Sequence, residues 1–238
     1  METLLRGGGA KIHSFHDITS FDNIVSAWQR FSHDKQKKQD VIEFKLRLMD
    51  NLYQLHIDLQ NKTYIHGNYT YFIITDPKKR DIHKSSVYDR IVHHMLYTAL
   101  YPYFHSKFIH DSYSCRINKG THRAIDRFKQ FSRKCSRNNT RTCWVLKCDI
   151  RKFFASIDHG ILKRILHRHI NGDDTIALFE NIIDSFHTTG KQNVGLPLGN
   201  LTSQLLVNVY MNKFDQFVKH QLKQKFYIRY ADDFVFFF

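Results

Sequence analysis

The 238-residue sequence predicts a folded protein of the α+β class. Several segments have apolar residues at near-helical spacing, which is typical of amphipathic helices. Short aromatic and β-branched runs, such as residues 226–229 and 234–238, predict strands. Hydrophobic residues make up 42% of the chain and charged residues 24%, which excludes a wholly disordered protein. No apolar run approaches the roughly 18 residues of a membrane-spanning helix, so we expect no membrane partner.

The first half of the chain is expected to form helices and one hairpin. In order, these elements are a helix near residues 23–31 within an N-terminal leader (1–40), a helical segment at 41–59, and a hairpin with strands at 69–75 and from Ile82 around a basic turn at 76–80. Ser86 is a suitable N-cap for the next helix. Pro102, which lacks an amide hydrogen, is expected to end or interrupt that helix. Thr121 is expected to cap the helix that follows.

The second half is expected to place acidic residues at strand ends. Residues 143–149 read as an apolar strand of the buried type that ends at Asp149. Helices are expected near residues 161–169, 174–186 and 205–222, with a loop at 190–199. The two strand-like runs near the end flank Tyr230-Ala231-Asp232-Asp233.

The charge of the chain indicates a polyanionic partner. Lys and Arg number 36 and Asp and Glu 22, giving a net charge of +14. We expect nucleic acid rather than a membrane surface, because no basic amphipathic helix is evident. The four cysteines lack the C-x-x-C spacing of zinc sites and fit the reduced thiols of a cytoplasmic protein.

Asp232 and Asp233 form an unusual turn between two hydrophobic strands. Adjacent carboxylates repel each other unless a cation lies between them, and hairpin turns favour Asp-Gly or Asn-Gly instead. Asp149 ends another strand 83 residues before Asp232. Oxygen ligands suit Mg²⁺, and a pair of such ions supports in-line phosphoryl transfer. On these residues alone, an ordinary polar turn and a strand-end or helix-capping Asp149 remain the alternatives.

The Tyr230–Asp233 segment resembles the YxDD signature of reverse transcriptases. Four further segments resemble other blocks of that family in the expected order. These segments are residues 78–82 with 89–94, residues 113–122, residues 147–159 and residues 195–204. Cys115 is a departure, since the family usually has an aromatic residue there.

This resemblance implies the fingers and palm of a right-hand polymerase, with a small antiparallel palm sheet backed by helices. Residues 41–142 would form mostly fingers and residues 143–238 the palm, truncated after the YADD hairpin, with the thumb absent. The implied enzyme is an RNA-directed DNA polymerase, a nucleotidyltransferase that binds an RNA template, a DNA or RNA primer and dNTPs. Polymerase activity of this truncated chain on its own is therefore not expected with certainty, since the thumb and primer grip would hold the primer terminus.

The resemblance also assigns site residues. Asp149, Asp232 and Asp233 would be catalytic and would hold two Mg²⁺ ions, replaceable by Mn²⁺, with help from the main-chain carbonyl of Ile150. Lys78 and Arg80 correspond to cations that grip the triphosphate, and the bulky Phe154 to a residue that excludes a ribose 2′-OH. The implied dNTP-binding set is Lys78, Arg80, Arg116, Phe154, Leu198 and Gly199.

Leu198 occupies a position where most reverse transcriptases have Gln, and the block ends Ser203-Gln204 rather than Ser-Pro. This combination resembles the enzymes of diversity-generating retroelements, found in bacteria, archaea and their phages. These enzymes copy a template RNA with frequent errors opposite adenine (mutagenic retrohoming) and work with a small basic accessory protein. Leu198 cannot hydrogen-bond to a nucleotide, which weakens polar discrimination. The alternative for Leu198 is that it only packs beneath the nucleotide and that other residues set the fidelity. The alternatives for the whole chain are a group II intron-like or retron reverse transcriptase and an inactive nucleic-acid-binding remnant.

Overall fold

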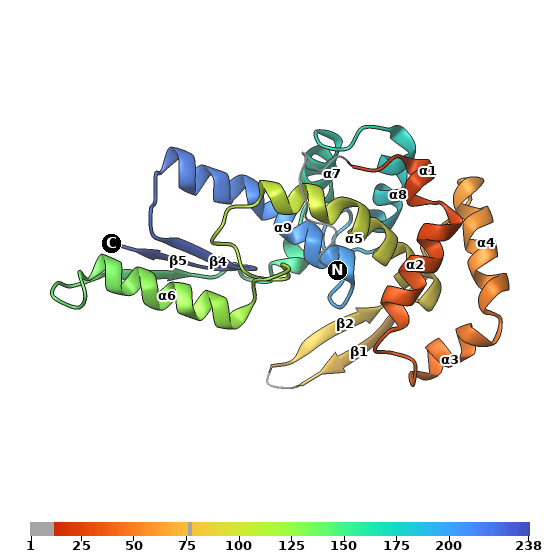
Figure 1. Cartoon of the computed structure of the whole chain (residues 1–238), viewed down its shortest axis with the longest axis horizontal. Coiled ribbons are helices and arrows are strands. Elements are labelled where there is room, and N and C mark those ends of the chain that lie inside the picture. Colours follow the sequence, from red (N-terminus) through yellow and green to blue (C-terminus); the bar gives the residue numbers. More distant parts are fainter. Residues whose placement is uncertain (1–11, 76–77) are drawn as a thin grey trace. The chain divides into compact units, whose positions relative to one another are not determined.

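The computed structural model describes residues 12–75 and 78–238 (Figure 1). It has the predicted α+β composition, with helices and two small antiparallel sheets. The chain forms two compact units: unit 1 contains the described residues up to Tyr103 together with Phe154–Gln204, and unit 2 contains Phe104–Phe153 and Leu205–Phe238. The division into a leader, fingers and palm at residues 40 and 142 stays a prediction. In the described part of the chain, no helix is both long and apolar enough to cross a bilayer.

Unit 1 is mainly helical. Its elements are α1 (Phe15–Ile18), α2 (Phe21–Ser32), α3 (Gln39–Leu46), α4 (Leu48–Gln60), β1 (Thr70–Ile74), β2 (Arg80–Lys84), most of α5 (Val87–Lys107), a 3-10 turn (Phe154–Ser156), α7 (His159–His167), α8 (Asp173–Asp184) and the start of α9 (Leu201–Gln216). β1 and β2 form the predicted antiparallel hairpin, with Ile74 opposite Arg80. Asp76 and Pro77 of the expected basic turn lie outside the described residues. The core of this unit includes Ile24, Phe31, Leu55, Leu59, Ile91, Met95, Leu162, Phe179 and Ile183.

The helix expected near residues 23–31 is confirmed as α2 and packs within unit 1. α2 begins after Ser20, whose hydroxyl accepts a hydrogen bond from the Asn23 amide. Its apolar side buries Ile24, Ala27 and Phe31, and burial of this area stabilises the helix. Residues 1–11 lie outside the described residues.

Helix α5 begins as predicted but does not end at Pro102. The Ser86 hydroxyl accepts a hydrogen bond from the Asp89 amide at 3.1 Å, which confirms the N-cap. The helix continues through Pro102 to Lys107. A proline inside a helix costs about 3 kcal/mol, and burying one large apolar side chain returns a similar amount, about 2 kcal/mol. Tyr101 and Phe104, on either side of Pro102, are both buried, so packing outweighs the lost hydrogen bond.

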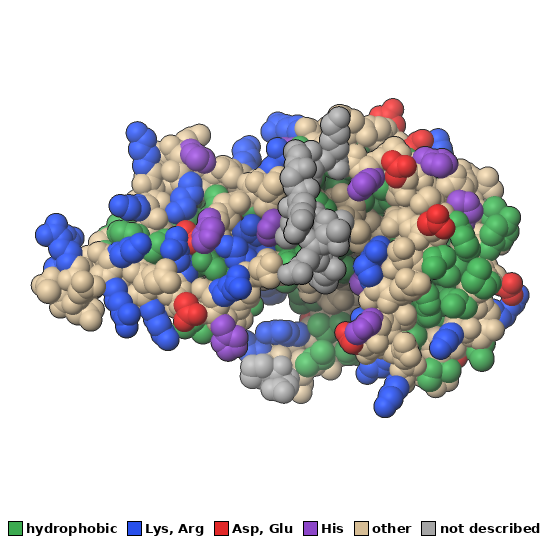
Figure 2. All heavy atoms as spheres, in the orientation of Figure 1, with side chains coloured by type: hydrophobic (Ala, Val, Ile, Leu, Met, Phe, Trp, Pro, Cys, Tyr) green, Lys and Arg blue, Asp and Glu red, His purple; other side chains and the backbone are tan. Residues whose placement is uncertain are grey.

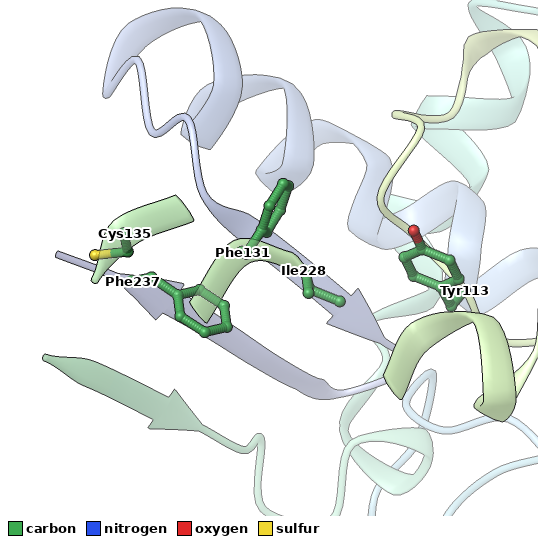
Figure 3. Packing of buried hydrophobic residues seen from close by; sticks show 5 residues of the cluster. All are labelled: Tyr113, Phe131, Cys135, Ile228 and Phe237. Carbon is green, nitrogen blue, oxygen red and sulfur yellow. The ribbon is translucent and has the colours of Figure 1, made fainter. Parts of the chain in front are cut away.

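Unit 2 is built on a three-stranded antiparallel sheet. β3 (Val145–Cys148), β4 (Tyr227–Tyr230) and β5 (Asp233–Phe237) pair in the order β3-β5-β4. One face packs on α6 (Thr121–Cys135), where Phe131 and Cys135 lie against Ile228 and Phe237 (Figure 3). The opposite face is covered by the end of α9 and a π-helical turn (Phe217–Gln221), which contribute Phe214 and Val218. The sheet is thus enclosed by helices from both sides.

Two expectations for this unit are corrected. β3 is an edge strand rather than a buried one, because β5 alone pairs with it in the sheet. Val145 is 46% exposed and Leu146 51% exposed. Thr121 is the first residue of α6, not its cap; the cap is Gly120, with φ +103°. The Thr121 hydroxyl lies 3.0 Å from the hydroxyl of Tyr230, a partner that a local pattern could not reveal.

Candidate active site

Three acidic side chains from two separate segments converge in unit 2. β3 and β5 are antiparallel with Cys148 opposite Phe234. This register places the residue after Cys148, Asp149, beside the residue before Phe234, Asp233. Asp232 lies in the adjoining turn, and one carboxylate oxygen from each of the three residues lies within 4.8 Å of the others. The register of the sheet therefore creates the acidic cluster.

The turn that presents Asp232 has a strained backbone. Tyr230 pairs with Asp233, so Ala231 and Asp232 form a two-residue loop. Ala231 adopts φ +55°, in the left-handed region that a two-residue hairpin requires and that side chains disfavour. Such residues cost of order 1–3 kcal/mol and persist where the surroundings hold them.

The cluster is electrostatically suited to a divalent cation. Burial raises the pKa of the Asp232 carboxyl, and the negative charges of Asp149 and Asp233 raise it further, against a main-chain hydrogen bond that lowers it. The Lys147 ammonium lies 3.5 Å from Asp233, but both side chains are largely exposed, so this pair contributes little. All three donors are carboxylate oxygens, which Mg²⁺ and Mn²⁺ prefer. The residues present therefore fit such an ion.

In unit 1, the loop with Leu198 and Gly199 is hydrogen-bonded to strand β2. The His83 amide donates to the Leu198 carbonyl at 3.1 Å, and the Asn200 side-chain amide donates to the His83 carbonyl at 3.1 Å. Gly199 has φ +107°, and a Cβ there would lie 3.1 Å from the Ile82 side chain. Glycine is thus required both by the backbone conformation and by the close approach of β2.

Phe154, Lys78 and Arg80 belong to the same unit. The Phe154 carbonyl accepts a hydrogen bond from the Leu196 amide at 2.8 Å, so the same loop contacts both β2 and the segment of Phe154. Lys78 and Arg80 are exposed at the tip of the hairpin. Among residues 12–75 and 78–238, neither forms an ion pair, which leaves both available to an anion.

Arg116, in unit 2, is engaged with the main chain. Its Nη1 donates to the carbonyls of Ile109 and Ser112 at 2.7 and 2.9 Å, and its Nη2 donates to that of His105 at 3.4 Å. The guanidinium also lies over the Phe108 ring. These contacts hold the guanidinium against the main chain of unit 2, and the triphosphate contact expected of Arg116 stays a prediction.

A buried ion pair next to the acidic cluster was not anticipated from the sequence. Arg229 of β4 and Asp215 of α9 are both fully buried and lie 2.7 Å apart. The available signal was a charged residue at an inward position of the aromatic strand Tyr227–Tyr230, since a buried arginine requires a partner.

A small sheet with three clustered carboxylates is compatible with a divalent cation, as found in centres that carry out phosphoryl transfer. Residues 74–238 match the family described as "Reverse transcriptase (RNA-dependent DNA polymerase)". The chain belongs to the reverse transcriptase family.

Curated relatives and solved structures agree with this assignment. Protein YkfC of Escherichia coli (strain K12) is 29% identical over 145 residues, covering 59% of this chain and 38% of YkfC. The putative COX1/OXI3 intron 2 protein of Saccharomyces cerevisiae is 22% identical over 143 residues, covering 58% of this chain and 16% of that protein. A chain of the "Partial Cas6-RT-Cas1--Cas2 complex" shares the fold, with a TM-score of 0.56 and 20% identity over 94% of this chain and 38% of that one. The chain therefore spans well under half the length of these relatives.

Proposed function

We propose that the chain provides RNA-directed DNA polymerase activity, adding dNTPs to a primer on an RNA template. The convergence of Asp149, Asp232 and Asp233 within 4.8 Å, in a chain of the reverse transcriptase family, is the main support. Phosphoryl transfer requires little covalent chemistry from a protein beyond positioning and charge stabilisation, and a cluster of three carboxylates that can hold divalent cations is suited to both.

The three carboxylates would hold two Mg²⁺ or Mn²⁺ ions, with the main-chain oxygen of Ile150, which directly follows Asp149, as a further ligand. When bound, the ions would lower the pKa of the primer 3′-OH and neutralise charge at the α-phosphate. Burial, together with the negative charges of Asp149 and Asp233, raises the pKa of the Asp232 carboxyl. Its carboxylate therefore has most to gain from a neighbouring cation.

The incoming nucleotide would contact residues of unit 1. Arg80 and Lys78 are exposed cations, the first suited to bidentate and the second to point contacts with phosphate. Phe154 would exclude the ribose 2′-OH, and Leu198 and Gly199 would lie near the base and sugar. Their support is the hydrogen-bonded connection from Phe154 through Leu196 and Leu198 to His83 of β2.

The template and primer would be held mainly through their phosphates. Figure 2 shows Lys and Arg side chains gathered around α6. The exposed cations of this helix and the loop after it are Arg123, Lys129, Arg133, Lys134, Arg137 and Arg141. These six cations outnumber Asp126, the exposed acid on the same helix. The surface is therefore strongly positive and suited to nucleic acid.

Primer extension on poly(rA)/oligo(dT) tests the activity. We expect Mg²⁺-dependent extension by the wild-type chain and at least about a hundredfold less by Asp232→Asn, since removing one carboxylate charge removes several kcal/mol of transition-state stabilisation. Asp50→Asn makes the same charge change at an exposed position of α4 and should leave extension unchanged. Salt-sensitive binding of nucleic acid without any extension by the wild type would instead identify a non-catalytic binding remnant.

We further propose that the enzyme is of the diversity-generating retroelement type and works with a small basic accessory protein. Leu198 supports this: its carbonyl is fixed by the His83 amide, and its side chain is apolar where a hydrogen-bonding Gln is usual. A site that cannot hydrogen-bond its substrate discriminates less between nucleotides.

The error spectrum tests this subtype. We expect Leu198→Gln to lower misincorporation opposite template adenine, because the amide restores a polar contact to the nucleotide. Leu198→Met, which is apolar and of similar volume, should retain the wild-type spectrum. An unchanged spectrum in Leu198→Gln would remove this explanation of infidelity.

A group II intron-like enzyme is the second candidate. It is favoured by two relatives whose names refer to introns, the intron 2 protein of S. cerevisiae and an uncharacterized 91 kDa protein in the cob intron of Schizosaccharomyces pombe, which is 26% identical over 152 residues. A template/variable repeat pair beside the gene would support the retroelement type. Intron RNA sequence flanking the gene would support the intron type.

A further inference from the structure

Arg229 is fully buried three residues before Asp232, and all of its side-chain donors have partners. Its Nε and Nη2 donate to the two oxygens of Asp215 at 2.8 and 2.7 Å, in a bidentate pair. The remaining donors reach Ser112 Oγ at 3.2 Å, Asn208 Oδ1 at 3.1 Å and the Ala231 carbonyl at 2.9 Å. One arginine thus links α9, the segment at Ser112 and the turn of the hairpin.

The contact with Ala231 is the one that concerns the active site. Ala231 is the residue with φ +55° that forms the turn with Asp232. Its carbonyl is fixed by the Arg229 guanidinium, and rotation of that peptide unit would move the Asp232 backbone. A strained turn needs such an external contact to persist.

Arg229 is itself held rigidly. Its amide donates to the Asp111 carbonyl at 2.9 Å, and its carbonyl accepts from the Tyr113 amide at 3.0 Å. Asp215 also accepts a hydrogen bond from the Tyr227 hydroxyl at 2.7 Å, but Arg229 reaches both of its carboxylate oxygens independently of that contact. The guanidinium therefore has little freedom to leave Ala231.

Stability alone does not account for this arrangement. Burying two charges carries a desolvation penalty, and a well-packed apolar pair is often as stable as a buried ion pair or more so. An apolar pair could fill the same volume but could not donate to the Ala231 carbonyl. The forked guanidinium supplies that donor while Asp215 compensates its charge.

We infer that Arg229, fixed by Asp215, is a positioning residue that holds the Ala231–Asp232 turn in the conformation presenting the Asp232 carboxylate to the acidic cluster. This inference rests on the proposed metal-binding role of Asp149, Asp232 and Asp233. The ion pair contacts no substrate in this account and acts only through the turn.

Three variants of the full chain separate positioning from folding. Arg229→Lys keeps the charge but loses the fork. The double variant Arg229→Met with Asp215→Leu removes both buried charges together, which preserves folding, and removes the donor to Ala231. Tyr227→Phe is the matched control, because it takes one hydrogen bond from the same Asp215 without touching the turn.

The readouts are Mn²⁺ binding followed by electron paramagnetic resonance, amide hydrogen exchange at residues 231–233, and steady-state primer extension. In the first two variants we expect at least tenfold weaker Mn²⁺ binding, faster exchange in the turn, and a kcat lower by tenfold to a hundredfold with an unchanged KM for dNTP. Tyr227→Phe should match the wild type in all three.

Wild-type Mn²⁺ affinity, turn exchange and kcat in a folded Arg229→Lys or double variant would overturn the inference. A different result would contradict the proposed function: the wild type would bind no Mn²⁺, or Asp232→Asn would bind it as well as the wild type. In that case faster turn exchange in the Arg229 variants would still support the positioning contact, and unchanged exchange would overturn it.

Discussion

At the scale of single residues, buried polar groups fix the loop that contains Leu198 and Gly199. The Ser85 hydroxyl donates to Asn200 Oδ1 at 2.8 Å, and two residues further on the Thr202 hydroxyl lies 2.6 Å from His93 Nδ1. The other ring nitrogen of His93 is 3.2 Å from His66 Nε2. These contacts join the loop to α5 and β2, and they require a neutral His93 because burial lowers its pKa to about 3.

Acid should therefore destabilise unit 1 through His93. A histidine with a lowered pKa binds fewer protons when folded than when unfolded, so its stabilising effect is complete above about pH 6.5 and is lost as the pH falls toward 3. We expect the free energy of unfolding of His93→Gln to be lower than that of the wild type at pH 7. Between pH 6 and 4, this free energy should fall by about 1.4 kcal/mol less per pH unit in the variant than in the wild type. Denaturant unfolding across this range measures the slope. His122→Gln, on the exposed side of α6, is the control, and equal slopes in wild type and His93→Gln would contradict the prediction.

At the scale of elements, the local patterns predicted most helices and strands. The β1–β2 hairpin, the two strands around Asp232 and the Ser86 cap are encoded by residues close in sequence, and all three are confirmed. The strand ending at Asp149 was located correctly, but its burial was not. An apolar run indicates a strand without indicating whether it lies at the centre or the edge of a sheet.

The errors in the elements have tertiary causes. The continuation of α5 through Pro102 depends on burial of the flanking aromatic residues. The Thr121 hydroxyl pairs with Tyr230, more than a hundred residues away. In each case a contact distant in sequence outweighs a local preference.

The candidate site was predictable where family motifs mark it and not where the contacts are structural. The motifs indicated Asp149, Asp232 and Asp233, and the sheet register brings them together. They could not show that Arg116 is occupied by main-chain carbonyls. Nor could they pair Arg229 with Asp215, because the partner lies on a helix and the pairing requires the folded unit.

At the scale of the whole molecule, the predicted site residues are found in both units, and each set lies within its own unit. The acidic cluster belongs to unit 2, whereas Lys78, Arg80, Phe154, Leu198 and Gly199 belong to unit 1. Within unit 2, two segments far apart in the sequence bring the three carboxylates together, and we propose that these carboxylates share one metal site. This claim can be tested without substrate.

Cleavage by bound Fe²⁺ tests it most directly. Fe²⁺ replaces Mg²⁺ at oxygen-rich sites and, with ascorbate and peroxide, releases hydroxyl radicals that cut the nearby backbone. We predict cuts both beside Asp149 and at residues 231–233 of the wild-type chain, suppressed by excess Mg²⁺, with both sets lost together in Asp232→Asn. Cuts at one segment alone, or cuts that persist in Asp232→Asn, would contradict a shared metal site.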